Sequence, residues 1–220
     1  MARPPQVEVT VLRVFCGDGA AGGNPLGVVL GGSAVAGDDR QALAAHLGYS
    51  ETVFVDDATQ GRIQIFTPTV EMPFAGHPSV GTAWLLRREG HAVDALQLPA
   101  GKVPVRFDGD VPFIAGRPEW APPFELRRLA DAPAVEAEPV IEEGLVYVWA
   151  WIDEPVGLVR TRSFVPEAGI AEDEATGAAA VRLCSKLGRP IEIHQGRGSV
   201  IHARPLEDGM VEIGGSVVAD

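Results

Sequence analysis

The sequence predicts an α+β fold made of two similar halves. Three observations support this: many short alternating strands, two helices that each follow a glycine-bearing loop, and a motif that recurs. Residues 7–15, for example, alternate apolar and polar side chains as a half-buried strand does. The motif Arg-x-x-x-Phe-x-Pro begins at Arg62 and again at Arg160, displaced by 98 positions, and both copies end a strand that a loop and a helix follow. Chance agreement at three positions is the alternative to a genuine duplication.

The elements of the first half follow from periodicity and turn residues. Asp38 or Asp39 is expected to cap a helix that Gly48 ends, and a second helix is expected from Ser79 to about Arg88. The glycine-rich segment 17–25 predicts a loop. Strands are expected at residues 7–15, 26–32, 51–55 and 61–66, with a meander of short strands over 96–116.

The second half begins with a segment rich in Pro, Ala and Glu, residues 119–143, which we interpret as the region between domains with room for one short helix. A helix capped by Thr176 and ended by Gly188 follows two alternating strands. Strands are expected at residues 144–153, 156–166, 191–196, 200–206 and 210–218. We therefore divide the chain into an N-terminal half, residues 1–118, and a C-terminal half, residues 119–220.

Composition restricts the class of protein. The net charge of −12 opposes binding to nucleic acid or to an anionic membrane. The sequence shows no apolar stretch of membrane-spanning length and no apolar signal-peptide core. Its two cysteines form neither a disulfide framework nor a CxxC pattern. These features favour a cytoplasmic protein.

The starts of the two central helices carry the chemistry that the sequence offers. A helix N-terminus has unpaired N–H groups and a partial positive charge, so it attracts carboxylates and oxyanions. Gly76 and His77 stand at the first start, and Asp173 and Glu174 precede the second. If the halves are similar, the two starts face each other across a cleft.

Each of these residues also has a simpler interpretation when taken alone. His77, which precedes a proline, fits a turn residue bonded to a carbonyl, and Asp173 and Glu174 fit solvated charges near a helix cap. Residues 50–52 fit a turn into a strand, and the Gly-Gly-Asn-Pro segment fits an ordinary loop. Only their combination favours a functional site.

The combination resembles a known family, the phenazine-biosynthesis-like (PhzF-like) isomerases, which share their fold with diaminopimelate epimerase. The compound motif S-E-T…F-T-P…E-x-P-F-A-G-H-P is highly specific, and the matches occur in family order in both halves, with none between about residues 119 and 156. The matching stretches are VFCGDGAAGGNPLGVVL, LGYSETVFV, IQIFTPTVEMPFAGHPSVGTAWLL, SFVPEAGIAEDEATGAAA and HQGRGSVIHARP.

The resemblance implies a fold, an activity and a site. Each half would be a curled, mostly antiparallel sheet around a central helix, with the active site between the halves, no cofactor, no metal, and commonly a homodimer. The phenazine enzyme of the family isomerises a dihydro-hydroxyanthranilate by moving a hydrogen. The catalytic residues would be Glu51, His77 and Asp173. The substrate-binding residues would be Asn24, Ser50, Gly76, Thr176, Gly177 and Ala178.

The chemistry of these residues agrees with an isomerase that moves a proton on a small carboxylate-bearing metabolite. One carboxyl group that both takes and gives the proton suffices, and Glu51 suits this role if burial raises its pKa toward the working pH. His77 and Asp173 would hold polar groups of the substrate. The two helix starts would fix its carboxylate and stabilise enolate-like charge.

Three departures from the family pattern keep an alternative open. Ala178 stands where the phenazine enzyme has a serine, Glu174 replaces the usual proline, and the second half is short for the family. The prediction for this half includes the exchange of a strand at its C-terminus. The alternative is a catalytically degenerate protein that binds a small molecule in the same place. An epimerase with two opposed thiols is disfavoured, because Cys184 lies inside the second helix and Cys16 has no assigned role.

Overall fold

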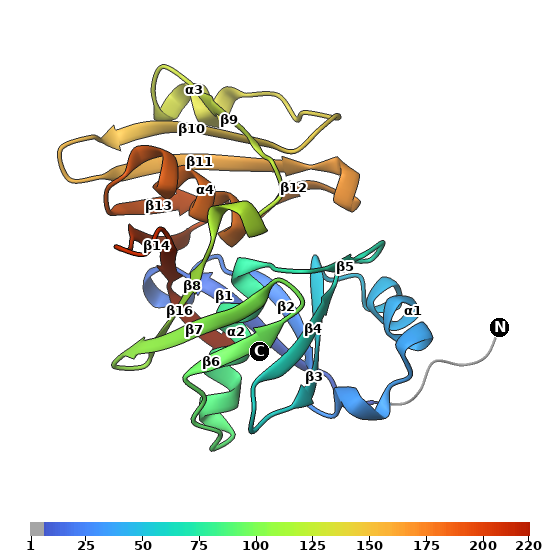
Figure 1. Cartoon of the computed structure of the whole chain (residues 1–220). Coiled ribbons are helices and arrows are strands. Elements are labelled where there is room, and N and C mark those ends of the chain that lie inside the picture. Colours follow the sequence, from blue (N-terminus) through green and yellow to red (C-terminus); the bar gives the residue numbers. More distant parts are fainter. Residues whose placement is uncertain (1–6) are drawn as a thin grey trace.

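The structure, a computed structural model, describes residues 7–220. In this part of the chain the strands form one continuous sheet of 16 strands, and four α-helices pack against it (Figure 1). The strands of the first half are β1 (Thr10–Cys16), β2 (Asn24–Val29), β3 (Glu51–Asp57), β4 (Arg62–Phe66), β5 (Glu71–Met72), β6 (Ala95–Leu98), β7 (Gly101–Asp108) and β8 (Val111–Gly116). Those of the second are β9 (Glu125–Arg128), β10 (Val146–Asp153), β11 (Leu158–Val165), β12 (Ile170–Asp173), β13 (Ile191–Gln195), β14 (Ser199–Pro205), β15 (Val211–Gly214) and β16 (Ser216–Ala219). The helices are α1 (Gly37–Leu47), α2 (Gly76–Arg88), α3 (Ala132–Ala137) and α4 (Gly177–Leu187).

The strand pairing repeats between the halves. The recurrent motif begins on β4 in the first half and on β11 in the second. In the first half, β4 pairs antiparallel with β3 and β5. In the second half, β11 pairs antiparallel with β10 and β12 in the same way. Each of β4 and β11 also pairs parallel with the strand after its helix, β6 or β13. The pairs β2–β3 and β9–β10 are likewise both parallel. This repetition supports the internal duplication, whereas the boundary at residue 118 stays a prediction.

Two sets of strand pairs connect the halves. β8 pairs antiparallel with β15, and β16, the last strand, pairs antiparallel with β1. A single further bridge joins Cys16 of β1 to Ser199 of β14. Figure 1 shows β9–β13 gathered with α3 and α4 in one part of the molecule, and β1–β7 with α1 and α2 in the other. The site residues of both halves are therefore attached to one hydrogen-bonded framework.

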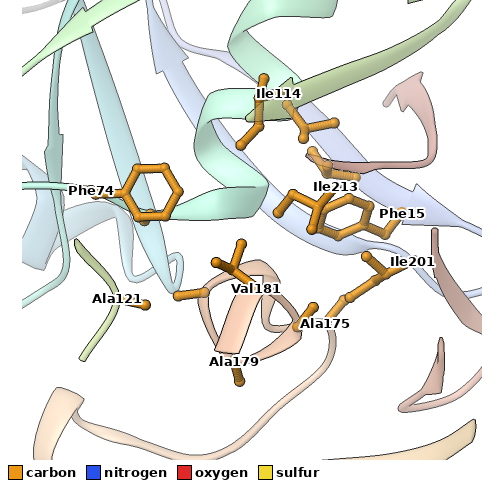
Figure 2. Close-up of a cluster of buried hydrophobic side chains, with 14 of the residues drawn as sticks. Phe15, Phe74, Ile114, Ala121, Ala175, Ala179, Val181, Ile201 and Ile213 are labelled. Carbon is orange, nitrogen blue, oxygen red and sulfur yellow. The ribbon is translucent and has the colours of Figure 1, made fainter. Parts of the chain in front are cut away.

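The main core surrounds the two central helices, α2 and α4. Both helices are buried along most of their length, and their charged residues lie toward their C-terminal ends. Figure 2 shows Phe74, Val181, Ile213 and Phe15 filling the space where α2, α4 and the neighbouring strands meet. All four are buried. The N-termini of the two helices thus lie inside the protein.

Most predicted elements are confirmed, but the side-chain caps predicted for α1 and α4, the start of the second helix and the interpretation of residues 119–143 were wrong. The helices α1 and α4 end as predicted, at Gly48 and Gly188 in the left-handed conformation. However, α1 begins at Gly37 and has no side-chain cap, so neither Asp38 nor Asp39 caps it. The second helix begins at Gly76 rather than Ser79, because a proline is tolerated in a first turn.

A further error concerns residues 119–143, which contain β9 as well as the expected short helix, α3. This segment is thus part of the sheet of the second half and not only a connection. Within residues 7–220, no helix is long and apolar enough to cross a membrane.

Candidate active site

Two strands and one helix of the first half bring together Asn24, Glu51 and His77. Asn24 is the first residue of β2 and Glu51 the first of β3, and these strands run parallel, so both side chains lie at the same edge of the sheet. His77 is the second residue of α2. Its Nδ1 atom lies 3.4 Å from Oε2 of Glu51. The predicted acid–base residue therefore faces the predicted histidine.

Burial sets the protonation of this pair. It raises the pKa of Glu51 to about 7, against a smaller lowering effect of the Ser50 hydroxyl. It lowers the pKa of His77 to about 4, although Asp173 and the Pro25 backbone act in the opposite direction. Near neutral pH the imidazole is therefore uncharged, and Glu51 is populated in both its protonated and its ionised form. Oε2 of Glu51 and Nε2 of His77 are buried and have no hydrogen-bond partner within the protein.

Asp173, the last residue of β12, comes from the second half. Its Oδ1 accepts a hydrogen bond of 2.7 Å from Nδ2 of Asn24, and its Oδ2 accepts one of 2.6 Å from the Thr176 hydroxyl. Burial raises the pKa of Asp173 to about 6, and the charge of Glu51 adds to this effect. His77, Thr176 and Asn24 oppose it. Asn24 thus connects the carboxylate of one half to the strands of the other.

The N-termini of α2 and α4 meet in direct contact and not across an open cleft. A Cβ atom on Gly76 would lie 2.7 Å from Cα of Gly177, and one on Gly177 would lie 2.9 Å from Cα of Gly76. Real Cβ atoms do not approach backbone atoms so closely. Both positions therefore require glycine for the contact between the helices, a reason that sequence reasoning did not supply.

All of the predicted site residues lie in this region. The hydroxyl of Ser50 donates to Oδ1 of Asn24 at 3.2 Å. Thr176 directly precedes α4, but its hydroxyl bonds to Asp173 and does not cap the helix. Ala178, in the first turn of α4, is buried. The side chains that the sequence marked as one group are thus connected through Asn24, Asp173 and the two helix starts.

Sequence reasoning missed Gln195. It is fully buried at the end of β13 and contacts both Asp173 and Thr176. A signal was present, because the alternation of β13 places Gln195 on the same inward face as Ile191 and Ile193. A polar residue at an inward position needs internal hydrogen bonds and so suggests a specific role.

The remaining histidines and cysteines lie apart from this chemistry. His194 and His202 both approach the Glu192 carboxylate on the surface, at 2.8 Å and 3.7 Å. Cys16 and Cys184 are free and buried. In the described residues 7–220, no group of three or more His, Cys, Asp or Glu side chains is arranged to hold a metal ion.

Comparisons of the sequence with known proteins identify a family. The model of the phenazine biosynthesis-like protein family, PhzC-PhzF, matches residues 13–132. The trans-2,3-dihydro-3-hydroxyanthranilate isomerase of Pseudomonas aeruginosa is 31% identical over 217 residues, which cover 80% of this chain and 78% of the relative. An uncharacterized isomerase of Deinococcus radiodurans is 30% identical over 254 residues, with 87% and 81% covered.

Solved structures share the fold. A putative phenazine biosynthesis PhzC/PhzF protein from Clostridium difficile superposes with a TM-score of 0.79 at 19% identity, covering 98% of this chain and 97% of that one. A predicted epimerase from Pseudomonas aeruginosa gives a TM-score of 0.76 at 24% identity, with 98% and 97% covered. The α+β fold predicted from the sequence is thereby confirmed. From the match of its sequence to the family model and to these relatives, the chain belongs to the phenazine biosynthesis-like protein family.

Proposed function

We propose that this isomerase moves a proton within a small carboxylate-bearing metabolite, and that Glu51 is the group that removes and returns it. The supporting observation is the Glu51 carboxyl itself. Its Oε2 atom is buried and has no hydrogen-bond partner within the protein, and its pKa is raised to about 7. A carboxyl of this kind serves both as a base and as an acid near neutral pH.

The proposed step balances within the substrate. The Glu51 carboxylate takes a proton from a carbon atom, and the electron pair of the broken C–H bond moves into the adjacent unsaturated system as an enolate-like anion. The protonated carboxyl, whose O–H proton exchanges with solvent, then delivers a proton to another carbon atom, and the double bond shifts. Because Glu51 gains one proton and gives up one proton in each cycle, the residues of the chain are unchanged at its end.

Neutral His77 and ionised Asp173 would orient the substrate. Nε2 of His77 is buried and has no protein partner, which leaves it available to a polar group of the ligand. The helix starts at Gly76 and Gly177 direct the positive ends of two dipoles toward the same region. They would offset the negative charge of the two carboxylates and stabilise the charge that develops on the substrate.

Three further expectations belong to the same proposal. The chemistry would need no cofactor, the protein would form a homodimer, and it would work in the cytoplasm. The substrate of the Pseudomonas aeruginosa relative is one candidate among small cyclic carboxylates. Ala178 offers no hydroxyl at the second helix start, so a substrate group at that position would have to bind to the backbone.

Hydrogen exchange in deuterated water tests the proposal. The wild type is incubated with a panel of small unsaturated and cyclic carboxylates, including the substrate named for the relative. Label at carbon is then followed by NMR. We expect deuterium incorporation by the wild type and a loss of at least about 100-fold in Glu51→Gln, the size typical of losing a general acid–base group.

Glu71→Gln is the matched control. Glu71 is exposed, and its carboxylate accepts a hydrogen bond from Nε2 of Gln64 on the surface, so this variant should exchange label like the wild type. Exchange that persists unchanged in Glu51→Gln would remove Glu51 from the mechanism. A ligand that binds without any exchange in the wild type would favour the alternative, a binding protein that has lost catalysis.

A further inference from the structure

Gln195 uses its whole hydrogen-bonding capacity beneath the candidate site. Its Nε2 donates to the carbonyl oxygen of Asp173 at 2.8 Å and to the hydroxyl oxygen of Thr176 at 3.0 Å. Its Oε1 accepts from the backbone N–H of Thr176 at 3.2 Å and from the hydroxyl of Tyr147 at 3.0 Å. One side chain thus holds both ends of the segment between Asp173 and α4.

The backbone partners fix the orientation of this amide. The carbonyl of Asp173 can only accept, so the amino group of Gln195 must face it, and the N–H of Thr176 can only donate, so the amide oxygen must face that atom. The same reasoning orients Asn24, whose Nδ2 faces the carbonyl of Ala175 at 2.9 Å. Neither amide can be reversed without leaving buried backbone groups unpaired.

These orientations determine the direction of the bonds to Asp173. The hydroxyl of Thr176 receives an N–H from Gln195, so its single proton is directed to Oδ2 of Asp173. The amide of Asn24 donates to Oδ1. Both oxygens of Asp173 therefore accept hydrogen bonds, an arrangement that favours the ionised carboxylate.

The first half shows that the fold itself does not require this network. Arg62 and Arg160 occupy the same position of the repeated motif, and they pair with Gln97 and His194. The next residues, Leu98 and Gln195, therefore correspond. Likewise Ala75 precedes α2 where Thr176 precedes α4. The same junction is packed with apolar residues in one half, so the buried amide in the other is not needed for packing alone.

We propose that Gln195 is a positioning residue, which directs the Thr176 hydroxyl to Asp173 and thereby holds that carboxyl group ionised and correctly oriented. Asp173 is the residue through which Gln195 acts. The inference rests on the proposed role of Asp173 in the site. It deepens that role by naming the group that controls the protonation of Asp173.

Several other charged groups surround Asp173. Glu51 of β3 and His77 of α2 both act on its charge. Glu172, which precedes Asp173 on β12, forms an ion pair with Arg162 of β11. The carboxylate of Glu174, which follows the strand, accepts hydrogen bonds from the backbone N–H of Arg197 and the hydroxyl of Ser199. None of these contacts includes Gln195, so a change at Gln195 reaches Asp173 through Thr176 and the backbone.

The test follows the titration of Asp173 directly and needs no substrate. The protein is labelled with ¹³Cγ-aspartate, the resonance of Asp173 is assigned by its loss in Asp173→Asn, and its midpoint is measured by NMR between pH 3 and 9. In Gln195→Leu, which installs the residue of the first half, we expect the midpoint to rise by about one pH unit. Gln195→Glu should also raise it, because a carboxylate cannot donate to Thr176 and adds negative charge.

Tyr147→Phe is the control, because it removes one bond to Oε1 of Gln195 and leaves the donors to Asp173 and Thr176 in place. Its midpoint should equal that of the wild type. An unshifted midpoint in folded Gln195→Leu, or an equal shift in Tyr147→Phe, would overturn the proposal. Failure of both Gln195 variants to fold would do the same, by making the residue structural. If deuterium exchange persists in Glu51→Gln while the Asp173 midpoint shifts in the Gln195 variants, the proposed function fails but the positioning role of Gln195 is supported.

Discussion

The contact between the two helix starts makes a quantitative prediction for Gly76→Ala. The added Cβ would lie 2.7 Å from Cα of Gly177 and 2.7 Å from Cδ1 of Ile213, whereas carbon atoms in contact prefer about 3.5–4.0 Å. The Ile213 side chain can rotate away, but the backbone of Gly177 can move only with α4. The two helices must therefore separate by roughly 0.8 Å or more.

Overpacking of this kind costs about 1–3 kcal/mol. The higher helix propensity of alanine returns at most about 1 kcal/mol. The two effects together span about 0–3 kcal/mol, and we take the middle of this range. We therefore expect Gly76→Ala to lower the free energy of unfolding by about 1–2 kcal/mol, which for a chain of this size lowers the melting temperature by roughly 2–8 °C. The loss should be the same in the presence and absence of salt, because no charge is altered.

Gly37→Ala supplies the matched control. Gly37 is also the first residue of a helix, but a Cβ there would meet nothing within 4 Å. This variant should be neutral or slightly stabilised. Thermal unfolding followed by circular dichroism, with urea unfolding as a second measurement, compares the two. If Gly76→Ala melts at or above the temperature of Gly37→Ala, the contact between the helix starts is not as tight as described.

Two more predictions concern buried carboxylates. The pKa of Glu51 is raised from 4.5 to about 7, so the folded state binds its proton more tightly than the unfolded chain, and this group lowers stability as pH rises through that window. Relative to the wild type, Glu51→Gln should therefore become more stable between pH 5 and pH 8, by up to about 3 kcal/mol. Urea unfolding of both proteins at both pH values measures this, and a difference in the free energy of unfolding that did not change with pH would contradict it. Glu212 behaves in the opposite way: burial alone would raise its pKa, but hydrogen bonds from Arg106 and Arg204 hold it below the ordinary value. The stability that the Glu212 carboxylate contributes is present above pH 4.5 and is lost on acidification. Glu212→Gln should therefore lower the free energy of unfolding by about 1–3 kcal/mol at pH 7 and by less at pH 3. Equal losses at both pH values would refute the role of the charge.

Local signals predicted the local features of the fold well. The ends of α1 and α4 were predictable because glycine alone adopts the left-handed conformation at low cost, and Gly48 and Gly188 do so. The start of α1 was not, because its backbone begins after Ala36 without a capping side chain. The strand β9 was missed because it has only four residues, three of which are charged, and only its pairing with β10 makes it a strand.

The candidate site could be predicted only as a set of residues. Their types suggested acid–base chemistry, and the family resemblance grouped Glu51, His77 and Asp173. The distances between them depend on pairings between segments far apart in the chain, which no local pattern contains. Gln195 and the contact between Gly76 and Gly177 depend on tertiary packing in the same way.

The shared sheet restricts how the two halves of the protein can move. β8 and β15 are paired over four residues, and β16 completes the edge beside β1, so both junctions are rows of main-chain hydrogen bonds. In hinged enzymes, a few flexible residues let the domains separate. Here, a wide separation of the two halves would break the main-chain hydrogen bonds of these two strand pairs. A relative movement of the halves that keeps these hydrogen bonds must therefore come from a change in the twist of the shared sheet and not from a hinge.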